Sequence, residues 1–443
     1  MKKPVLPEKI NRGETMREPL SLQAAIREAN RCLLCHDAPC SDGCPAGTDP
    51  AKFIRQIRFY NYKGAARTIR NNNILGTVCS FICPVEKLCE KECSAKALED
   101  PINIAGLQRF AAEYGQSHAV EPMEKSLNHA GRVAVIGAGP AGMGCAAELA
   151  KLNYKVVIFE KENHAGGVPF WNIPDYRLPL QALLNDLKVL NDLGVQINYN
   201  SPITTDDDLT RLFGDGFEAV FVSTGLAIPL TLPLLKGFSN ATDYISFLRK
   251  VKFNRADMNL TGKNVAVIGG GSVAIDSAVS AKAAGAAKVY LISLEHLNEL
   301  PADQEEIHLA RLMNIEFRAG QQITGIIADK PLITGIKGVE TEWVEPGNFS
   351  PDNARIINGT EFSLRTDWVV QAIGTKPNIT GLERLNKKGK GLADVNNHFE
   401  TNLTGVFAGG DLVNGGATVV QAVGEGKKAA AAIHNFIKWR VRK

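Results

Sequence analysis

The sequence predicts an α/β protein in which two similar α/β units, one inserted in the other, follow an α-helical domain. Three observations predict this class. A pattern of buried strand, glycine-rich turn, helix and second strand begins at Val133, and it begins again at Val265. Eight of the nine cysteines lie between Cys32 and Cys93, ahead of both copies. The length of 443 residues fits about three domains.

The composition excludes several classes of protein. A net charge of +3 is too small to favour nucleic acid, and an aromatic content of 7% offers no stacking platform for bases. Residues 1–20 hold charges and prolines without an apolar run, so we expect no secretory signal. No apolar segment reaches the length of a membrane span. We therefore expect a cytoplasmic protein, in which many cysteines indicate metal or redox chemistry rather than disulfides.

The helical domain begins after a lead, residues 1–20, that we expect to be flexible. A short amphipathic helix is predicted over residues 20–31, and a helical hairpin lies between the two groups of cysteines. In this hairpin Thr48 is the expected N-cap, and Pro50 suits the first turn. A polar stretch over residues 121–131 is the expected linker to the first α/β unit.

The clustered cysteines form two groups with short spacings. The first group is Cys32, Cys35, Cys40 and Cys44, and the second is Cys79, Cys83, Cys89 and Cys93. Thiolates at these spacings, with a proline directly after Cys44 and Cys83, are typical of iron–sulfur clusters. Structural zinc is an alternative because His36 lies in the first group, and unligated thiols are another. So many cysteines exceed one zinc site, so the spacing predicts two metal centres and leaves their type and ligands open.

The first α/β unit carries the pattern of a Rossmann-like dinucleotide-binding domain. Gly137 allows a tight turn, Gly139 lets the backbone approach a pyrophosphate, and Gly142 lets the helix pack closely. The phosphates are expected at the helix N-terminus, where free N–H groups and the helix dipole favour negative charge. Glu160 follows the second strand and is placed to accept from ribose hydroxyls. Further candidate contacts are Pro140, Ala141, Gly167 and Gly225.

The second α/β unit repeats this arrangement. Gly269 and Gly271 match the first two glycines, and Ala274 takes the third position, where a small side chain still permits close packing. Ser272 and Val273 begin the helix and complete the candidate site. Two such units indicate two nucleotides, or one site and a decayed copy. The retained glycines favour two nucleotides.

A segment near the C-terminus completes the first unit. A buried strand ends in Gly410 and Asp411, and a long helix is expected from Thr418 to Lys438. The second unit is therefore inserted in the first, and the chain crosses between them near Gly225 and Gly374. Asp411 either contacts the nucleotide or is a turn acid satisfied by its own loop. The candidate cofactor contacts at the start of the helix are Thr418, Val419 and Val420, and Gly410 and Gly374 are further candidate cofactor contacts.

Neither α/β unit holds a Cys-x2-Cys pair, which an enzyme that passes hydride from a flavin to a dithiol would need. The ninth cysteine, Cys145, is alone on the first helix and is expected to be a small core residue. Electrons from a flavin bound in the first α/β unit would therefore leave through the cysteine-rich domain rather than through a dithiol. The expected domains are residues 1–125 (helical), 126–240 with 373–443 (first α/β unit) and 241–372 (second α/β unit).

Several stretches of the helical domain resemble dihydropyrimidine dehydrogenases. Residues 31–40 read RCLLCHDAPC and residues 43–46 read GCPA, and the similarity continues at 48–50, 63–66, 101–104 and 107–110. The resemblance covers essentially the whole chain and includes the bacterial NAD-dependent subunits that take electrons from NADH. The small subunit of glutamate synthase and related NADPH:ferredoxin oxidoreductases belong to the same wider family, but their cysteine region has a different local sequence.

The resemblance implies FAD in the first α/β unit, NAD(P)H in the second and two [4Fe–4S] clusters in the helical domain. One cluster would use Cys32, Cys35, Cys40 and Cys93. The other would use Cys44, Cys83, Cys89 and Gln108, which leaves Cys79 without a cluster. Asp411 would bond the ribityl or phosphate region of FAD, and the helix from Thr418 would stabilise negative charge on the reduced ring. No acid–base or nucleophilic residue is expected, because the cofactors carry the hydride transfer.

The function expected by resemblance is that of an electron-input subunit. The chain would oxidise NADH and supply a partner FMN and iron–sulfur subunit that reduces uracil or thymine to the 5,6-dihydropyrimidine, since it lacks the FMN barrel of the long dehydrogenases. The alternatives are a glutamate synthase small subunit, an NAD(P)H:ferredoxin oxidoreductase, and a cluster-based redox sensor, which need not turn over NADH quickly.

A preference for NADH over NADPH is expected from the end of the second unit's second strand. Ser293, Leu294 and Glu295 follow it, where NADP-binding relatives place arginines that hold the 2′-phosphate. Glu295 would repel that phosphate and could accept from a 2′-hydroxyl. The alternative is that Glu295 only faces solvent.

Overall fold

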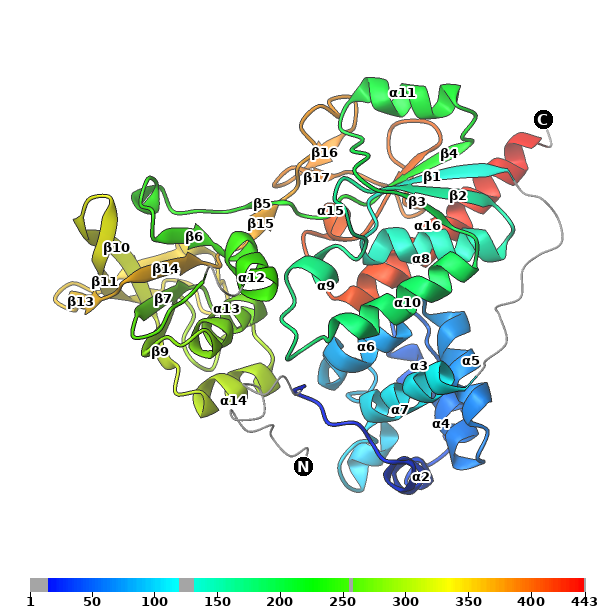
Figure 1. Cartoon of the computed structure of the whole chain (residues 1–443), viewed down its shortest axis with the longest axis horizontal. Coiled ribbons are helices and arrows are strands. Elements are labelled where there is room, and N and C mark those ends of the chain that lie inside the picture. Colours follow the sequence, from blue (N-terminus) through cyan, green and yellow to red (C-terminus); the bar gives the residue numbers. More distant parts are fainter. Residues whose placement is uncertain (1–14, 119–130, 255–257, 442–443) are drawn as a thin grey trace.

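The structure is a computed structural model that describes residues 15–118, 131–254 and 258–441. It has three parts: a helical domain, a first α/β domain that packs directly on it, and a second α/β domain at the left of the view (Figure 1). Within the described ranges, no helix combines the length and the apolar character that crossing a bilayer needs. The predicted lead up to residue 14 and the predicted linker up to residue 130 lie outside the described residues.

The helical domain packs its helices around a small apolar core. Its elements are α2 (Leu22–Asn30), α3 (Pro39–Asp42), α4 (Pro50–Arg58), α5 (Tyr62–Asn72), α6 (Gly76–Ile82), α7 (Ile104–Ser117) and the 3₁₀ turns η1 (Val85–Lys87) and η2 (Ser94–Ala97). The predicted N-cap Thr48 was wrong. Asp49 caps α4 by accepting from the Lys52 N–H at 3.1 Å. Thr48 is buried, and its hydroxyl lies 3.3 Å from the Cys44 sulfur, so it faces the cysteines instead.

The first α/β domain is built on a five-stranded parallel sheet in the order β18-β4-β1-β2-β3. The strands are β1 (Arg132–Ile136), β2 (Lys155–Phe159), β3 (Gln196–Asn198), β4 (Ala219–Val222) and β18 (Val406–Ala408). The helices are α8 (Pro140–Lys151), α9 (Val168–Trp171), α10 (Leu180–Asp192), α11 (Asp206–Gly214), α15 (Asp411–Asn414) and α16 (Val419–Val441). Apolar side chains of α8, α10 and α16 cover one face of the sheet, and those of α11 cover the other. A small hairpin, β16 (Lys387–Lys388) and β17 (Leu392–Ala393), precedes β18.

The second α/β domain has its own five-stranded parallel sheet, in the order β6-β14-β7-β8-β9. Its strands are β6 (Ala241–Asp243), β7 (Asn264–Ile268), β8 (Lys288–Ser293), β9 (Glu316–Ala319) and β14 (Trp368–Gln371). Its helices are α12 (Tyr244–Phe253), α13 (Ser272–Ala283) and α14 (Gln304–Leu312), with 3₁₀ turns η3 (Pro233–Leu235) and η5 (Pro351–Asn353). An antiparallel sheet of β10 (Gln321–Asp329), β11 (Leu332–Trp343), β12 (Ala354–Ile356) and β13 (Phe362–Arg365) extends it.

The strand order confirms the predicted insertion. β18 pairs in parallel with β4, although the whole second α/β domain lies between them in the sequence. Two short antiparallel strands, β5 (Ile228–Pro229) and β15 (Thr375–Lys376), join the domains. They follow the predicted crossing points Gly225 and Gly374, whose φ angles of 65° and 107° favour glycine.

Candidate functional site

The turn after β1 packs tightly against the protein at Gly137 and Gly142 and has free space beside Gly139. Gly137 has a φ of 97°, and a Cβ on Gly142 would lie 2.0 Å from the Gly137 carbonyl oxygen. A Cβ on Gly139 would meet no atom within 4 Å. Pro140 and Ala141 then begin α8, so the first free N–H groups of that helix lie at the turn. This geometry fits the pyrophosphate of a dinucleotide.

Glu160 fixes the turn from the end of β2. One of its carboxylate oxygens accepts from the Ala138 N–H at 2.7 Å, and the other accepts from the Glu162 N–H at 2.9 Å. Gly167 lies against the same turn, because a Cβ on it would be 3.0 Å from the Gly139 Cα. The structure therefore brings Glu160 and Gly167 to the turn, while the ribose contact of Glu160 stays a prediction.

The C-terminal segment approaches this turn from the other side. Gly410 has a φ of 71°, and a Cβ on it would lie 2.7 Å from the Cβ of Ala141. Asp411 accepts from the Ala417 N–H at 3.2 Å, and burial raises the pKa of its carboxyl. Thr418 caps α16, because its hydroxyl accepts from the Gln421 N–H at 3.2 Å. Next to it, Val419 is half-buried and Val420 is buried.

The turn after β7 has the same combination of tight packing at its first glycine and free space at its second. Gly269 has a φ of 135°, and a Cβ on it would lie 2.3 Å from the Ala372 carbonyl oxygen. At Gly271 the nearest atom to a Cβ would be 4.0 Å away. Ser272 and the exposed Val273 begin α13, and the small side chain of Ala274 packs against the turn. This turn fits the pyrophosphate of a second nucleotide.

Four of the predicted metal ligands surround one small cavity. Cys32, Cys35, Cys40 and Cys93 line it together with apolar side chains. Burial, and after it the neighbouring thiols of Cys93, Cys32 and Cys35, raise the pKa of Cys40 to about 11. The fold brings Cys93 here from the second sequence group, as the resemblance implied. Thiols this crowded favour a cation that binds them as thiolates.

The remaining clustered cysteines form a second, more deeply buried cluster of thiols, called here the deeper group: Cys44, Cys79, Cys83 and Cys89. Burial raises the pKa of Cys83 well above its ordinary value, and the thiols of Cys79, Cys89 and Cys44 raise it further. Cys79 lies on α6, where its sulfur accepts from the Asn73 amide at 3.4 Å. These contacts place Cys79 within the deeper group.

Gln108 is buried on α7, close to the same helix. Its amide nitrogen donates to the carbonyl of Gly76, the first residue of α6, at 2.7 Å. A ligating amide would bind iron through its oxygen, and this bond uses only the nitrogen. Both Gln108 and Cys79 therefore stay candidates for the fourth ligand of the deeper centre.

Eight clustered cysteines exceed the four ligands of one structural zinc site. Among the described residues, no three His, Cys, Asp or Glu side chains are placed to hold a single metal ion. Zinc needs its donors within about 2.0–2.3 Å of one point, whereas thiolates around an iron–sulfur cluster enclose a larger body.

Two family models match the chain. The one described as pyridine nucleotide-disulphide oxidoreductase matches residues 131–426, and the one described as dihydropyrimidine dehydrogenase domain II, 4Fe-4S cluster, matches residues 9–120. The chain is 37% identical over 414 residues to the NAD-dependent dihydropyrimidine dehydrogenase subunit PreT of Escherichia coli (strain K12), covering 94% of each. It is 35% identical over 414 residues to the PreT homolog of Salmonella typhi, again covering 94% of each. The chain belongs to the PreT family.

Other similarities of this PreT family member are more distant. It is 34% identical over 428 residues to the NADP(+)-dependent formate dehydrogenase subunit beta of Moorella thermoacetica, covering 90% of this chain and 60% of that one. T. acidophilum thioredoxin reductase superposes with a TM-score of 0.53 at 22% identity, over 68% of this chain and 97% of that one. Mycobacterium tuberculosis FprA in complex with NADPH gives 0.58 at 14% identity, over 70% and 85%. These structures share the fold, which confirms the predicted fold class.

Membership of the PreT family makes the chain a flavin- and iron–sulfur-dependent oxidoreductase, as the resemblance implied. FAD, a nicotinamide nucleotide and [4Fe–4S] iron are its cofactors. The number of clusters and the residues that hold each cofactor stay predictions, supported by the two open turns and the two cysteine groups.

Sequence reasoning missed a buried arginine that joins the two α/β domains of this PreT family member. Arg177, between α9 and α10, pairs with Asp276 of α13 at 2.7 Å and with Glu306 of α14 at 2.6 Å. Burial raises the pKa of both carboxyls, and Arg177 opposes the shift. One sequence signal existed, because an aspartate within the apolar run of α13 requires a buried partner.

A buried carboxylate also joins the first α/β domain to the cysteines. Asp186 of α10 accepts from the Val78 N–H at 3.0 Å and from the Thr77 N–H at 3.4 Å, at the start of the helix that carries Cys79. Burial raises the pKa of Asp186 to about 7. No local pattern in α10 distinguishes this aspartate from a surface one.

Proposed function

We propose that the chain is the cytoplasmic electron-input subunit of a pyrimidine dehydrogenase. It oxidises NADH at FAD and passes electrons through two [4Fe–4S] clusters to a partner FMN and iron–sulfur subunit. That partner reduces uracil or thymine to the 5,6-dihydropyrimidine. The names of the PreT relatives, which are subunits of an NAD-dependent dihydropyrimidine dehydrogenase, support the substrate and the need for a partner.

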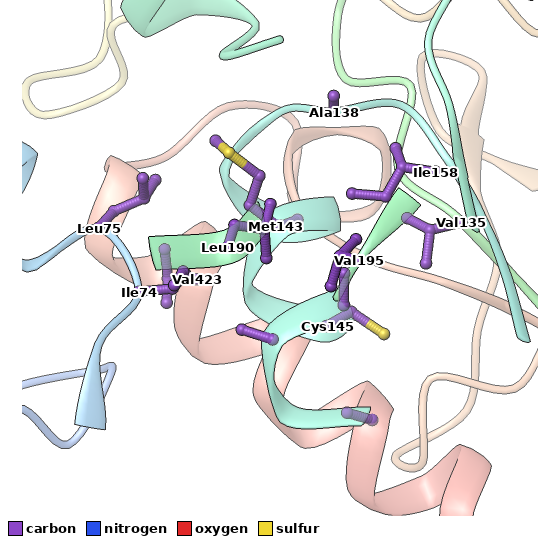
Figure 2. Close-up of a cluster of buried hydrophobic side chains, with 14 of the residues drawn as sticks. Ile74, Leu75, Val135, Ala138, Met143, Cys145, Ile158, Leu190, Val195 and Val423 are labelled. Carbon is purple, nitrogen blue, oxygen red and sulfur yellow. The ribbon is translucent and has the colours of Figure 1, made fainter. Parts of the chain in front are cut away.

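The observation that carries the proposal is a core shared by the cysteine domain and the flavin-type domain. Figure 2 shows Ile74 and Leu75 of the helical domain gathered with Leu190 of α10 and Val423 of α16. One core implies that the two domains hold a fixed distance, which electron transfer between them requires. Cys145 lies in the same core, as expected of a small buried residue.

The contact continues at the loop after Cys44. A Cβ on Gly424 of α16 would lie 2.3 Å from the Pro45 carbonyl oxygen, so the loop and the helix touch directly. Lys427 of α16 donates to the carbonyls of Ala46 and Asn72. Gly424 is six residues beyond Thr418, or about 9 Å along the helix. The Cys44 loop is therefore close to the candidate flavin contacts.

The residues of this chain bind and orient the nucleotides, and the bound cofactors supply the redox chemistry. The two open glycine turns hold the pyrophosphates. The α16 N-terminus brings the positive end of a helix dipole to the candidate FAD site, which favours a negatively charged reduced ring. Helix α12 of the second α/β domain packs on α9 of the first. Arg249 of α12 pairs with Glu162 at 2.9 Å, and its guanidinium lies 4.0 Å from the centroid of the Trp171 ring.

The purified holoprotein is expected to oxidise NADH with an artificial dye and to leave uracil and thymine unreduced. The reason is that one dinucleotide-binding turn of the chain is assigned to FAD and the other to NADH. Pyrimidine reduction therefore needs the FMN of a partner. Spectrophotometric NADH oxidation with dye, with uracil and with uracil plus the co-purified partner measures this. Uracil reduction by the single chain would contradict the proposal, and so would glutamate formation from glutamine and 2-oxoglutarate with a large partner. Slow dye reduction at saturating NADH would favour a redox sensor.

The Glu295→Arg variant is expected to use NADPH better relative to NADH. Glu295 is half-buried beside the second turn, where a Cβ on Gly270 would lie 2.9 Å from its carboxylate oxygen. An arginine there would attract the 2′-phosphate that the carboxylate repels. We expect the NADPH-to-NADH ratio of kcat/KM to rise at least about tenfold, or ~1.4 kcal/mol. Glu295→Gln removes only the repulsion and should give a smaller rise. A wild-type enzyme that prefers NADPH would refute the assignment.

A further inference from the structure

Arg17 lies where the helical domain meets both α/β domains. Its Nη2 donates to the Cys83 carbonyl at 3.0 Å, and its Nε and Nη2 donate to the Glu305 carboxylate at 3.2 and 3.1 Å. The Met16 N–H beside it donates to the Tyr176 carbonyl of the first α/β domain at 2.8 Å. The Nη1 of Arg17 is buried without a hydrogen-bond partner among the described residues. The guanidinium is thus held against the deeper cysteine group.

A second arginine contacts the other cysteine group in the same way. Arg58 of α4 donates from Nη1 to the Cys32 carbonyl at 2.9 Å. Burial raises the pKa of Cys32 and of Cys83, and in each case the adjacent arginine lowers it. Among the described residues, each cysteine group thus has an arginine hydrogen-bonded to the backbone carbonyl of one of its cysteines, and the deeper group also has Lys427 near Cys44. Arg17 differs from Arg58 because its carboxylate partner, Glu305, belongs to the second α/β domain.

Glu305 lies in the first turn of α14, a region fixed by ions from outside its own domain. Lys87 of the helical domain pairs with Asp303 at 2.6 Å, and Arg177 pairs with Glu306 at 2.6 Å. Arg17 is the third cation of this contact. The distance between Glu305 and Arg17 is therefore set by how the second α/β domain docks on the helical domain.

We propose that Arg17 is a positioning residue that sets the reduction potential of the centre held by Cys83, and that Glu305 makes this potential depend on domain docking. Reduction adds negative charge to a thiolate-bound cluster, so a fixed cation beside it favours the reduced form. A guanidinium stays charged at every relevant pH. A carboxylate 3.1 Å from that cation cancels part of its field. Undocking of the NADH-binding domain would thus raise the potential of the deeper centre. The inference rests on the two clusters of the proposed function and on no property of the pyrimidine.

The test is a potentiometric titration of the full-length holoprotein, followed by EPR, without NADH or partner. Arg17→Met should lower the midpoint potential of one cluster, and Glu305→Gln should raise the midpoint of the same cluster. Arg17→Lys keeps the charge and should shift it less than Arg17→Met. Arg58→Met is the matched control, because it should lower the midpoint of the other cluster alone. Loss of a signal in Cys83→Ser assigns the deeper centre.

Opposite shifts for Arg17→Met and Glu305→Gln support the inference, because loss of packing alone would not give opposite signs. Unchanged midpoints, or shifts in one direction for both variants, overturn it. If Arg17→Met fails to retain iron, Glu305→Gln decides alone, and an unchanged or lowered midpoint refutes the inference. A wild-type chain that holds only one cluster contradicts the proposed function instead.

Discussion

The Gly142→Val protein is expected to be purified without bound flavin. A Cβ at residue 142 would lie 2.0 Å from the Gly137 carbonyl oxygen and 2.8 Å from the Ser223 hydroxyl oxygen, so α8 must move away from the sheet. This movement would displace the helix N-terminus, which we assign to the FAD pyrophosphate. We expect the ratio of flavin to protein, measured by absorbance, to fall at least about tenfold. Overpacking should also lower stability by about 1–3 kcal/mol, seen as a lower Tm.

Two further variants separate flavin loss from general damage. Gly214→Val makes the same substitution at the exposed end of α11, where a Cβ would meet no atom within 4 Å, and should leave flavin content and Tm unchanged. Gly139→Ala is also free of clashes within the protein. It should lower flavin affinity without lowering the Tm of the apoprotein, because its methyl group would point into the candidate phosphate site. Full flavin content in Gly142→Val would refute the assignment of this turn.

The sequence was sufficient to predict features that depend on local backbone conformation or on a repeated pattern. Gly137 and Gly269 follow short, β-branched apolar runs that favour buried strands, and their φ angles of 97° and 135° are ones that other residues rarely adopt. The insertion followed from the same logic, because the glycines at 409 and 410 repeat the end of such a strand. These features need no knowledge of distant partners.

Features that depend on distant partners could not be predicted from the sequence. Thr48 and Asp49 are both good N-cap residues, and burial of Thr48 beside Cys44 decides between them. Arg177 and Asp276 are 99 residues apart, so no periodicity connects them. Arg17 was assigned to a flexible lead, yet it contacts Cys83 and Glu305. Resemblance, rather than spacing, placed Cys93 with the first group, where the structure also places it.

Gln108→Ala is expected to lose or alter one iron–sulfur cluster, whereas Cys79→Ser is expected to keep both. The resemblance assigns Gln108 as the fourth ligand of the centre that uses Cys44, Cys83 and Cys89, and the buried position of Gln108 on α7 supports this. An amide oxygen is neutral, so a cluster that it ligates carries one negative charge fewer than a cluster with a fourth thiolate. Because cluster potential depends on net charge, this ligand would give the chain two clusters of unlike potential.

The structure gives the rival assignment a real basis, which makes the pair of variants decisive. The thiol of Cys79 is close enough to Cys83 to raise its pKa, and burial raises the pKa of Cys79 itself to about 12. Iron content and the EPR spectrum after reduction measure both variants. Gln116→Ala, an exposed glutamine on the same helix, is the matched control and should resemble the wild type. Loss of a cluster in Cys79→Ser, with a normal spectrum in Gln108→Ala, would show that eight cysteines form two four-thiolate clusters. If Gln108→Ala alone loses iron, the charge difference between the clusters comes from their ligands. Arg17 then acts on the less negatively charged cluster, the one held by Cys83.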